Sequence, residues 1–529
     1  MDQRRLLIAS AISLLLIFAY QQLVLSRYAR RQVPTPRSTP PAESAVESPP
    51  AAASDLAADP GAAGFVTVET DVFQVSIAPI GARVVDVRLN AYARTVGRDG
   101  LLDLVEASPI LPLTLQLGAS ASDARLVYRP SRTDVAVHGG ETAEVVFTAD
   151  SGNGTHLEKR YRFAGNRYLF KLAATVSGKA PPPLSLGLIL APLPIDSPTA
   201  SPRAVALVAD SLVEKPVKIR ERFAPDHATT LVAEAPASDV QLGFSRWAGF
   251  AEQYFLAVAM PASGALPAVL TGAAGLPIVR MDAPVLGRKA KFAVYAGPKD
   301  REILARAGHD LERALNFGKF WFVAIPLLHA LRALQRVTGN YGVAIIVLTA
   351  LIKAATAPLT RTTFRNMREM QKIQPQMTKL RERFKDDQVA LQKEVMDLYR
   401  RHRVNPLAGC LPMVLQLPIF VGLYTTLSLS IELRHAPFAL WINDLSAPDR
   451  LVVGGVGLPV LTLLMGASMF LQQWLTPAQA DPAQQRMMMF MPVVFTFFFF
   501  KMPAGLVLYW LVNNVLTVGQ QYLMMRSMK

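Results

Sequence analysis

One segment in the C-terminal third of the chain constrains the fold most, because it is long and apolar enough to cross a membrane and yet carries a charge. Residues 341–358 read YGVAIIVLTALIKAATAP, and Lys353 is their single charged side chain. Insertion scales assign about +3 kcal/mol to an ammonium at the centre of a membrane helix, against roughly −0.3 to −0.6 kcal/mol for each Val, Ile or Leu. Such a helix is only marginally stable in lipid, so we expect Lys353 to be kept for a functional reason.

Two threonines share the helical face of Lys353. Thr349 lies four positions before it and Thr356 three positions after it, and both spacings bring side chains to one side of a helix. This polar face predicts the wall of a water-filled groove. The alternative is snorkelling, in which the lysine stem carries its ammonium to the nearest lipid headgroups.

Four further apolar segments follow, and none of the five contains Asp or Glu. They are residues 411–431, 451–475, 487–500 and 503–525. Lys353 therefore has no carboxylate partner within these segments, which favours water or a visiting anion over a buried ion pair.

The fifth segment carries a second polar face. Tyr509, Asn513, Thr517 and Gln520 recur at helical spacing, and Gln416 adds a polar position in the second segment. Interhelical hydrogen bonding, typically below about 1 kcal/mol for each contact, is the alternative to a groove. Two polar faces together with an unpaired ammonium favour the groove.

The N-terminal part divides into three regions. Residues 1–26 contain a long apolar run after Arg4 and Arg5 without an obvious small-residue cleavage site, which predicts an uncleaved membrane anchor rather than a signal peptide. Residues 27–64 are rich in Pro and Ala and predict an extended linker. Residues 65–308 alternate apolar and polar side chains with a period of two, which predicts a large antiparallel β-sandwich.

An amphipathic stretch at residues 309–340 connects this β region to the apolar segments. Its aromatic and basic side chains predict a helix in the outer membrane interface, and packing beneath the β domain is the alternative.

Loop charges set the predicted orientation. Residues 361–410 hold twelve Lys or Arg and six Asp or Glu, whereas residues 433–450 hold two of each kind. Basic loops stay in the cytoplasm, so the β domain is expected outside, with six spans and both termini inside. Residues 361–403 predict a cytoplasmic helical hairpin, in which Met367, Met370 and Met377 form either a partner-binding face or the hairpin's own core.

Composition excludes several functional classes. The formal charge is +15, but the basic residues cluster beside apolar segments, which indicates membrane topology rather than nucleic-acid recognition. Cys410 is the single cysteine, so an intrachain disulfide is excluded. There is no Walker-type phosphate loop, and the histidines and carboxylates of the β region show no metal or catalytic-triad spacing, so we expect no cofactor.

Several long motifs resemble the YidC family of membrane protein insertases. They are PLTRTTFRNMREMQKIQPQMTKLRERF (358–384), NPLAGCLPMVLQLPIF (405–420), DPAQQRMMMFMPVVFTFFFF (481–500) and PAGLVLYWLVNN (503–514). The resemblance covers about residues 65–529.

The resemblance implies a multidomain protein of the bacterial inner membrane: an anchor helix, a periplasmic β-supersandwich and a five-helix core of residues 341–529. The core's hydrophilic groove opens to the cytoplasm and the bilayer and is closed toward the outside. The family's essential basic groove residue falls on Lys353, where many bacterial relatives have arginine, and Trp510 falls where a substrate-contacting tyrosine is common. The implied partners are nascent membrane proteins, the Sec translocon, the ribosome, components of the signal recognition pathway and the lipid bilayer.

The sequence therefore favours an insertase and chaperone without covalent chemistry. A secondary transporter or channel is the alternative, although such proteins usually show internal repeats or intramembrane carboxylates. A membrane-tethered periplasmic enzyme, with its site in the β domain, is a third possibility.

Overall fold

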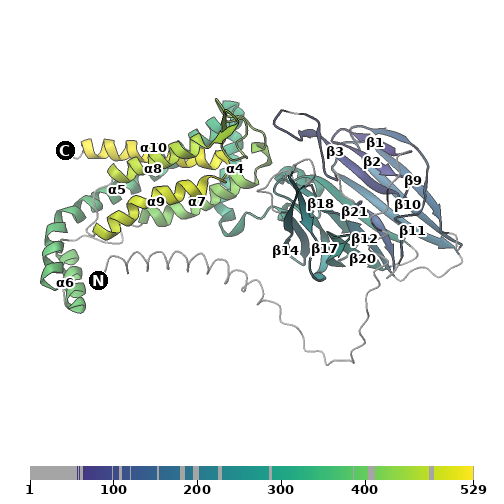
Figure 1. Cartoon of the computed structure of the whole chain (residues 1–529), viewed down its shortest axis with the longest axis horizontal. Coiled ribbons are helices and arrows are strands. Elements are labelled where there is room, and N and C mark those ends of the chain that lie inside the picture. The colour runs from purple at the N-terminus through teal and green to yellow at the C-terminus, as the bar shows by residue number, and fades with distance from the viewer. Residues whose placement is uncertain are drawn as a thin grey trace, which may run out of the picture.

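A β domain and a helical region lie side by side in the computed structural model (Figure 1). The structure describes Leu56, Asp59 and residues 64–527, except 98, 106–109, 119–120, 152–153, 179–184, 195–201, 224–228, 285–288, 385–386, 403–410 and 476–481. The predicted anchor, most of the predicted linker and Cys410 lie outside the described residues.

Two sheets build the β domain. The smaller sheet has the strand order β4-β3-β2-β1-β8. Its strands are β1 (Val66–Thr70), β2 (Phe73–Ala78), β3 (Arg83–Ala93), β4 (Leu101–Asp103) and β8 (Asp134–Val137).

The larger sheet has the order β6-β5-β12-β20-β19-β17-β18-β21-β11-β10-β9-β7, with β13 paired to β17 and β14 to β13. Its strands are β5 (Thr114–Leu117), β6 (Ala121–Ser122), β7 (Arg129–Pro130), β9 (Thr142–Asp150), β10 (Thr155–Ala164), β11 (Leu169–Gly178), β12 (Ser185–Leu190), β13 (Arg203–Val208), β14 (Ser211–Pro216), β17 (Val240–Ala251), β18 (Phe255–Pro261), β19 (Leu266–Ala273), β20 (Leu276–Pro284) and β21 (Lys289–Pro298). A separate hairpin joins β15 (Lys218–Phe223) to β16 (Thr229–Glu234).

Alternating side chains form the core between the two sheets. Phe73 of the smaller sheet packs against Phe163 and Phe170 of the larger one, with ring centroids 6.3 Å away in both cases. These rings are buried because each occupies the inward position of a strand with period-two burial. The predicted sandwich is thus confirmed.

The predicted antiparallel pairing is wrong at one edge of the smaller sheet. Strand β1 pairs in parallel with β8, with Val68 opposite Val135. Parallel neighbours need a crossover connection, and here the chain passes through strands of the larger sheet before it returns as β8.

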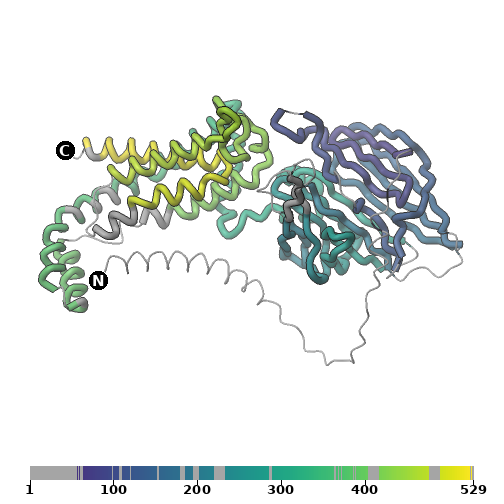
Figure 2. The backbone as a smooth tube through the Cα atoms, in the orientation of Figure 1, coloured from purple at the N-terminus to yellow at the C-terminus, as the bar shows by residue number. Residues whose placement is uncertain are grey.

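The helical region begins where β21 ends, and Figure 2 follows its course through the bundle. Its elements are α3 (Arg301–Ala307), η1 (Leu311–Ala314), η2 (Gly318–Phe320), α4 (Trp321–Thr338), α5 (Tyr341–Arg383), α6 (Gln388–Arg401), α7 (Leu411–Leu429), η4 (Ile431–Leu433), β22 (Leu451–Val453), β23 (Val456–Leu458), α8 (Val460–Leu475), α9 (Pro482–Phe499) and α10 (Ala504–Ser527). The β domain lies at one end of the bundle and α6 at the other (Figure 1).

Two predicted boundaries need correction. The expected apolar span at 451–475 is helical only in α8, because β22 and β23 form a hairpin whose turn places Gly454 and Gly455 at positive φ. The expected first span and the first arm of the hairpin are one continuous helix, α5, which Asn340 caps by accepting hydrogen bonds from the N–H groups of Gly342 and Val343.

The amphipathic stretch at 309–340 is also helical over a shorter range than expected. The turns η1 and η2 precede α4, which buries Ala324, Leu328 and Leu331. Trp321 and Phe322 in its first turn remain more than half exposed. The helix α4 therefore packs one face against the bundle and exposes aromatic rings in its first turn.

Among the described residues, one helical segment, residues 341–362 of α5, is long and apolar enough to cross a membrane. Shorter apolar stretches occupy Gln416–Leu429 of α7, Val460–Leu475 of α8 and Met489–Phe499 of α9.

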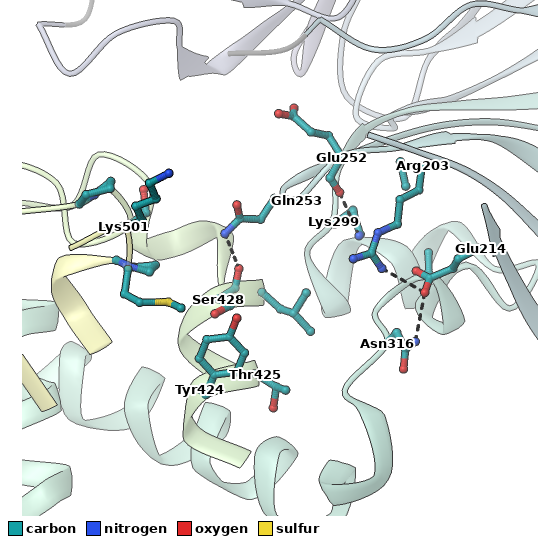
Figure 3. Close-up of a pocket in the computed structure, with 17 residues that line it drawn as sticks. Arg203, Glu214, Glu252, Gln253, Lys299, Asn316, Tyr424, Thr425, Ser428 and Lys501 are labelled. Atoms are coloured by element: carbon teal, nitrogen blue, oxygen red, sulfur yellow. Dashed lines mark hydrogen bonds and ion pairs between the residues drawn. The ribbon is translucent and has the colours of Figure 1, made fainter. Parts of the chain in front are cut away.

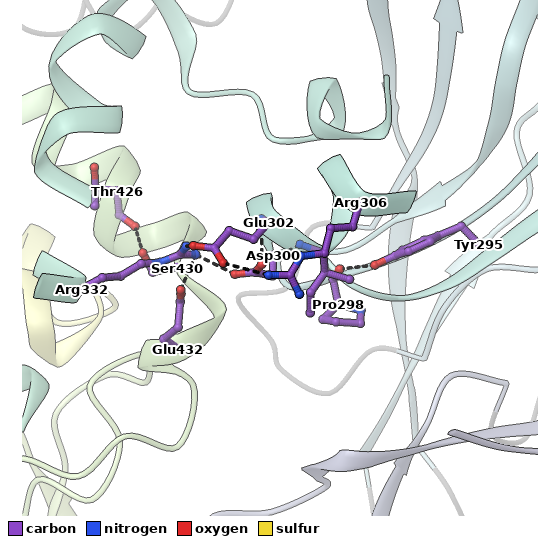
Figure 4. A network of polar contacts seen from close by, with 10 residues as sticks. Tyr295, Pro298, Asp300, Glu302, Arg306, Arg332, Thr426, Ser430 and Glu432 are labelled. Carbon is purple, nitrogen blue, oxygen red and sulfur yellow. Dashed lines mark hydrogen bonds and ion pairs between the residues drawn. The ribbon is translucent and has the colours of Figure 1, made fainter. Parts of the chain in front are cut away.

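An ion-pair network, here called the Arg332 network, fixes the β domain to the bundle (Figure 4). The guanidinium of Arg332 on α4 lies 2.6 Å from Asp300 Oδ2, 3.1 Å from Glu302 Oε1 and 2.5 Å from Glu432 Oε1. Asp300 caps α3 directly after the last strand of the β domain, and Glu432 lies in η4. One arginine on α4 thus joins α3, which follows the β domain, to η4, which follows α7.

Candidate functional site

The two predicted polar faces meet between α5 and α10. The Lys353 ammonium donates a hydrogen bond to Thr517 Oγ1 at 2.8 Å, and that hydroxyl donates to the carbonyl of Asn513 at 2.6 Å. Gln520 Nε2 lies 3.4 Å from the Lys353 carbonyl oxygen. The helical spacing read from each segment therefore placed these side chains on facing sides of two helices.

Lys353 is half-buried, and within the described residues its ammonium has a hydroxyl partner but no carboxylate partner. A lysine ammonium that gives up part of its hydration needs hydrogen-bond acceptors around it, and one hydroxyl uses only one of its three N–H groups. The remaining two can bind water or an anionic group.

A second contact joins α7 to α10. Gln416 Nε2 donates to the phenolic oxygen of Tyr509 at 2.9 Å, and Tyr509 is only 1% exposed. This pair lies two helical turns along α10 from the Lys353 contact. We use the name polar seam for Lys353, Gln416, Tyr509, Asn513 and Thr517.

The two threonines of α5 that were predicted to line the groove are bonded within their own helix. The Thr349 hydroxyl donates to the Ile345 carbonyl at 2.6 Å, and the Thr356 hydroxyl donates to the Ile352 carbonyl at 2.9 Å. Thr349 is 1% exposed and Thr356 half-buried. Thr356 is therefore the more accessible of the two for a groove.

Trp510 packs within an aromatic cluster rather than alone. Its ring centroid lies 4.9 Å from that of Phe420 on α7, and 5.3 and 6.0 Å from those of Phe499 and Phe495 on α9. The half-buried indole joins three helices.

Sequence reasoning missed a second row of polar contacts on α10. Asn514 Nδ2 donates to Ser468 Oγ at 3.1 Å, and Gln521 Nε2 donates to the Leu475 carbonyl at 2.8 Å, both toward α8. Asn514 and Gln521 are buried and seven positions apart. Their spacing was a readable signal of a second polar face.

Of the predicted hairpin methionines, the structure describes two side chains. Met370 is half-buried and Met377 is 5% exposed, and Ile373 of α5 and Leu398 of α6 are buried as well. The side chain of Met367 lies outside the described residues. The burial of Met377 favours the alternative of a self-packed hairpin.

The loop between α7 and α8 covers the ends of the helices beside the β domain. Its backbone accepts hydrogen bonds from Ala504 and Gly505 at the start of α10, both at 2.8 Å. Asp449, 4% exposed, accepts from the Trp441 indole at 2.7 Å and from the Leu461 N–H at 2.5 Å, at the start of α8. Sequence reasoning missed this cap.

Metal ligation has no support in the part of the chain that the structure describes, where no group of three or more His, Cys, Asp or Glu side chains could hold an ion.

Comparisons with known proteins match both halves of the fold. The family model for the 60Kd inner membrane protein matches residues 333–529, and that for the YidC periplasmic domain matches residues 65–330. A protein of Geobacter sulfurreducens named membrane protein insertase YidC is 37% identical over 99% of this chain and 98% of its own length. One of the same name from Pelobacter propionicus is 38% identical over 86% of this chain and 85% of its own length.

A crystal structure of an active YidC insertase with its first transmembrane domain resolved is also similar. It is 18% identical, covers 87% of this chain and 93% of its own, and superposes with a TM-score of 0.38.

Proposed function

The chain belongs to the YidC family of membrane protein insertases, and from this premise we propose that the polar seam between α5, α7 and α10 is the path by which it inserts nascent proteins. The resemblance read from its motifs is confirmed. The protein is an inner-membrane insertase with a periplasmic domain and not an enzyme, so both alternatives drawn from the sequence are set aside.

We infer that α5, α7, α8, α9 and α10 cross the inner membrane and that an N-terminal anchor adds a sixth span. The basic α5–α6 hairpin and the β domain lie at opposite ends of the bundle, which supports a cytoplasmic hairpin, a periplasmic β domain and cytoplasmic termini (Figure 1).

The polar seam would form the wall of a hydrated groove that opens toward the cytoplasm. A hydrophilic segment that crosses lipid leaves backbone groups unsatisfied, at a cost of several kcal/mol each. A water-filled groove over the inner half of the membrane shortens the distance over which the segment must cross lipid. At about 6 Å and an effective dielectric constant near 20, Lys353 would attract a carboxylate by roughly 2–3 kcal/mol, enough to favour entry without trapping the substrate.

The hydroxyl contact of Lys353, made without a described carboxylate partner, is the observation that carries this proposal. An ammonium neutralised by a fixed Asp or Glu would have little attraction left for a substrate. An ammonium bonded to a hydroxyl keeps its charge and two free N–H groups.

Closure toward the periplasm has support at the other end of the bundle. The loop between α7 and α8 is hydrogen-bonded across the start of α10, and the aromatic cluster around Trp510 fills the space between α7, α9 and α10. A substrate that enters from the cytoplasm would therefore leave sideways into lipid, and its translocated tail would move outward along the bundle.

Nascent membrane proteins are the substrates that the family implies. We extend the proposed partners to the Sec translocon, the ribosome and components of the signal recognition pathway, which would approach from the cytoplasmic hairpin or from the lateral face. The hairpin arms are joined by a 3.2 Å contact between His402 Nε2 and Gln376 Oε1, so a partner would meet a preformed surface.

Thiol labelling tests the groove directly. Cys410 is replaced by Ser, and single cysteines are placed at Thr517 in the polar seam and at Leu508, a 3% exposed residue on the same helix. A membrane-impermeant maleimide added from the cytoplasmic side should label Thr517→Cys readily and Leu508→Cys slowly. Equal protection of the two positions would contradict a hydrated groove.

A further inference from the structure

A pocket of about 340 Å³, lined by charged, polar and apolar side chains, lies where the β domain meets the outer ends of the helices (Figure 3). Its helical side comes from α7 and from the turn between α9 and α10, with Tyr424 and Lys501. Its other side comes from the β domain, with Arg203, Glu252 and Lys299. Its size is that of a small-molecule site rather than a packing defect.

Lys299 makes this pocket more than a gap between domains. Its side chain is 7% exposed, and among the described residues its ammonium donates to one acceptor, the Glu252 carbonyl at 3.1 Å. Burial lowers the pKa of Lys299 to about 8, an effect that the nearby Glu214 carboxylate offsets only in part. Two N–H donors of a buried cation thus remain available to a ligand.

The other charged groups of the pocket leave an excess of positive charge. Glu214 is already paired with Arg203 at 3.1 Å and accepts a hydrogen bond from Asn316 at 3.3 Å. Lys299, Arg203 and Lys501 together outnumber the carboxylates of Glu214 and Glu252, so the lining carries a net charge of about +1 when all are ionised. A singly charged oxyanion would balance it.

The surrounding residues place the pocket at the level of lipid headgroups, given the orientation proposed above. Lys501 lies two residues beyond the end of α9, in whose last turn Phe497 and Phe498 are 77% and 61% exposed. Trp321 and Phe322 are exposed at the start of α4, a few positions beyond Asn316 of the pocket. Aromatic rings next to a lysine at the end of an apolar helix are typical of a membrane–water interface.

We propose that this pocket binds the phosphodiester group of an outer-leaflet phospholipid, with Lys299 and Lys501 as its donors. Charge-assisted hydrogen bonds to the phosphate would use the free N–H groups of Lys299. A lipid held there would contact both the β domain and α7, and so fix the periplasmic domain against the membrane. The inference rests on the proposed orientation of the bundle but not on the polar seam.

Native mass spectrometry of the full-length protein in detergent tests the proposal. The delipidated protein is titrated with phosphatidylethanolamine, with diacylglycerol, which has the same chains without the phosphodiester, and with inorganic phosphate. Lys299→Gln and Lys501→Gln are compared with Lys319→Gln, an exposed interfacial lysine on η2 that does not line the pocket. Lys501 is exposed, so its variant keeps the test informative if Lys299→Gln unfolds.

We expect one phospholipid to be retained by the wild type and by Lys319→Gln, and its affinity to fall at least fivefold in Lys299→Gln and Lys501→Gln. Diacylglycerol should bind far more weakly to all four proteins. Equal retention of phospholipid by all four would overturn the proposal. Displacement of the lipid by millimolar inorganic phosphate, or by an acidic peptide, would overturn it in favour of a free-phosphate site or a substrate-chain site. If Lys299→Gln and Lys501→Gln lose phospholipid binding but insert substrate proteins at the wild-type rate, the proposed insertase function stands.

Discussion

The ammonium of Lys353 on α5 donates a hydrogen bond to the hydroxyl of Thr517 on α10, a residue 164 positions further along the chain. This contact brings two polar faces together inside an otherwise apolar bundle. It also leaves the positive charge of Lys353 unneutralised by any described carboxylate, which is the property that the proposed insertion mechanism requires.

Thr517→Val tests whether water is present around Lys353. Valine keeps the shape of the side chain and removes the hydroxyl that accepts from the ammonium. In a hydrated groove a water molecule replaces that hydroxyl, so insertion of acidic-tailed substrates into proteoliposomes should change by less than about threefold, in line with a contact worth under about 1 kcal/mol. A loss as large as that caused by Lys353→Ala would mean that the hydroxyl, rather than water, sustains the charge.

A double-mutant cycle measures the contact between Gln416 and Tyr509. Tyr509→Phe removes the phenolic oxygen and Gln416→Leu removes the amide, and the double variant removes both. Chemical unfolding in detergent should give a coupling free energy below about 1 kcal/mol, as found for hydrogen bonds between membrane helices. A coupling of several kcal/mol would show that the contact holds the helices together and does not belong to a wet surface.

The Arg332 network should contribute strongly to stability. Arg332→Met leaves the carboxylates of Asp300 and Glu432 without their shared partner, both of them less than a quarter exposed. Removing one member of a largely buried ion pair costs about 3–5 kcal/mol, which unfolding of the full-length protein in detergent can measure. The matched control is Arg336→Met, an exposed arginine one turn further along α4, which should cost less than about 0.5 kcal/mol. Equal effects of the two changes would contradict a special role for the Arg332 network.

Lys299 predicts a pH dependence of stability. Its pKa is lowered to about 8, mainly by burial, from 10.5 for an exposed lysine. Between these two pH values the unfolded chain holds a proton that the folded chain has released, so the contribution of Lys299 to the free energy of unfolding rises with pH. At about 1.4 kcal/mol for each pH unit, the gain is about 3 kcal/mol.

The measurement compares delipidated wild-type protein with Lys299→Met at pH 7.5 and pH 10.5, because other lysines and tyrosines titrate in the same window and cancel in the difference. The wild type should gain stability relative to the variant at the higher pH. A difference that does not change with pH would contradict a charged, buried Lys299.

Much of the helical region could be predicted because its signals are local. The spacing of Tyr509 and Thr517 indicated one of the two polar sides of α10, the side that meets α7 and α5. The hairpin of β22 and β23 could not be told from the start of α8, because a short run of valines around Gly454 and Gly455 suits a strand as well as a helix.

Contacts between distant segments left no such local signal. Nothing near Arg332 in the sequence indicates that it pairs with Asp300 and Glu432, and the parallel pairing of β1 with β8 depends on the path of the whole chain between them. Lys299 likewise stands between the end of β21 and the charged first turn of α3, and its position in a pocket follows from the meeting of two domains.

The proposed function depends on the charge of Lys353. The most direct test measures how fast the purified protein in proteoliposomes inserts two matched substrates. One substrate carries an acidic translocated tail and the other the same tail with Asp and Glu changed to Asn and Gln. An attraction of about 2–3 kcal/mol corresponds to a tenfold or larger effect on the acidic substrate. Lys353→Ala should therefore slow the acidic tail at least tenfold and the neutral tail little, and Lys353→Arg should restore the rate. Insertion of the acidic tail by Lys353→Ala at the wild-type rate would contradict the account.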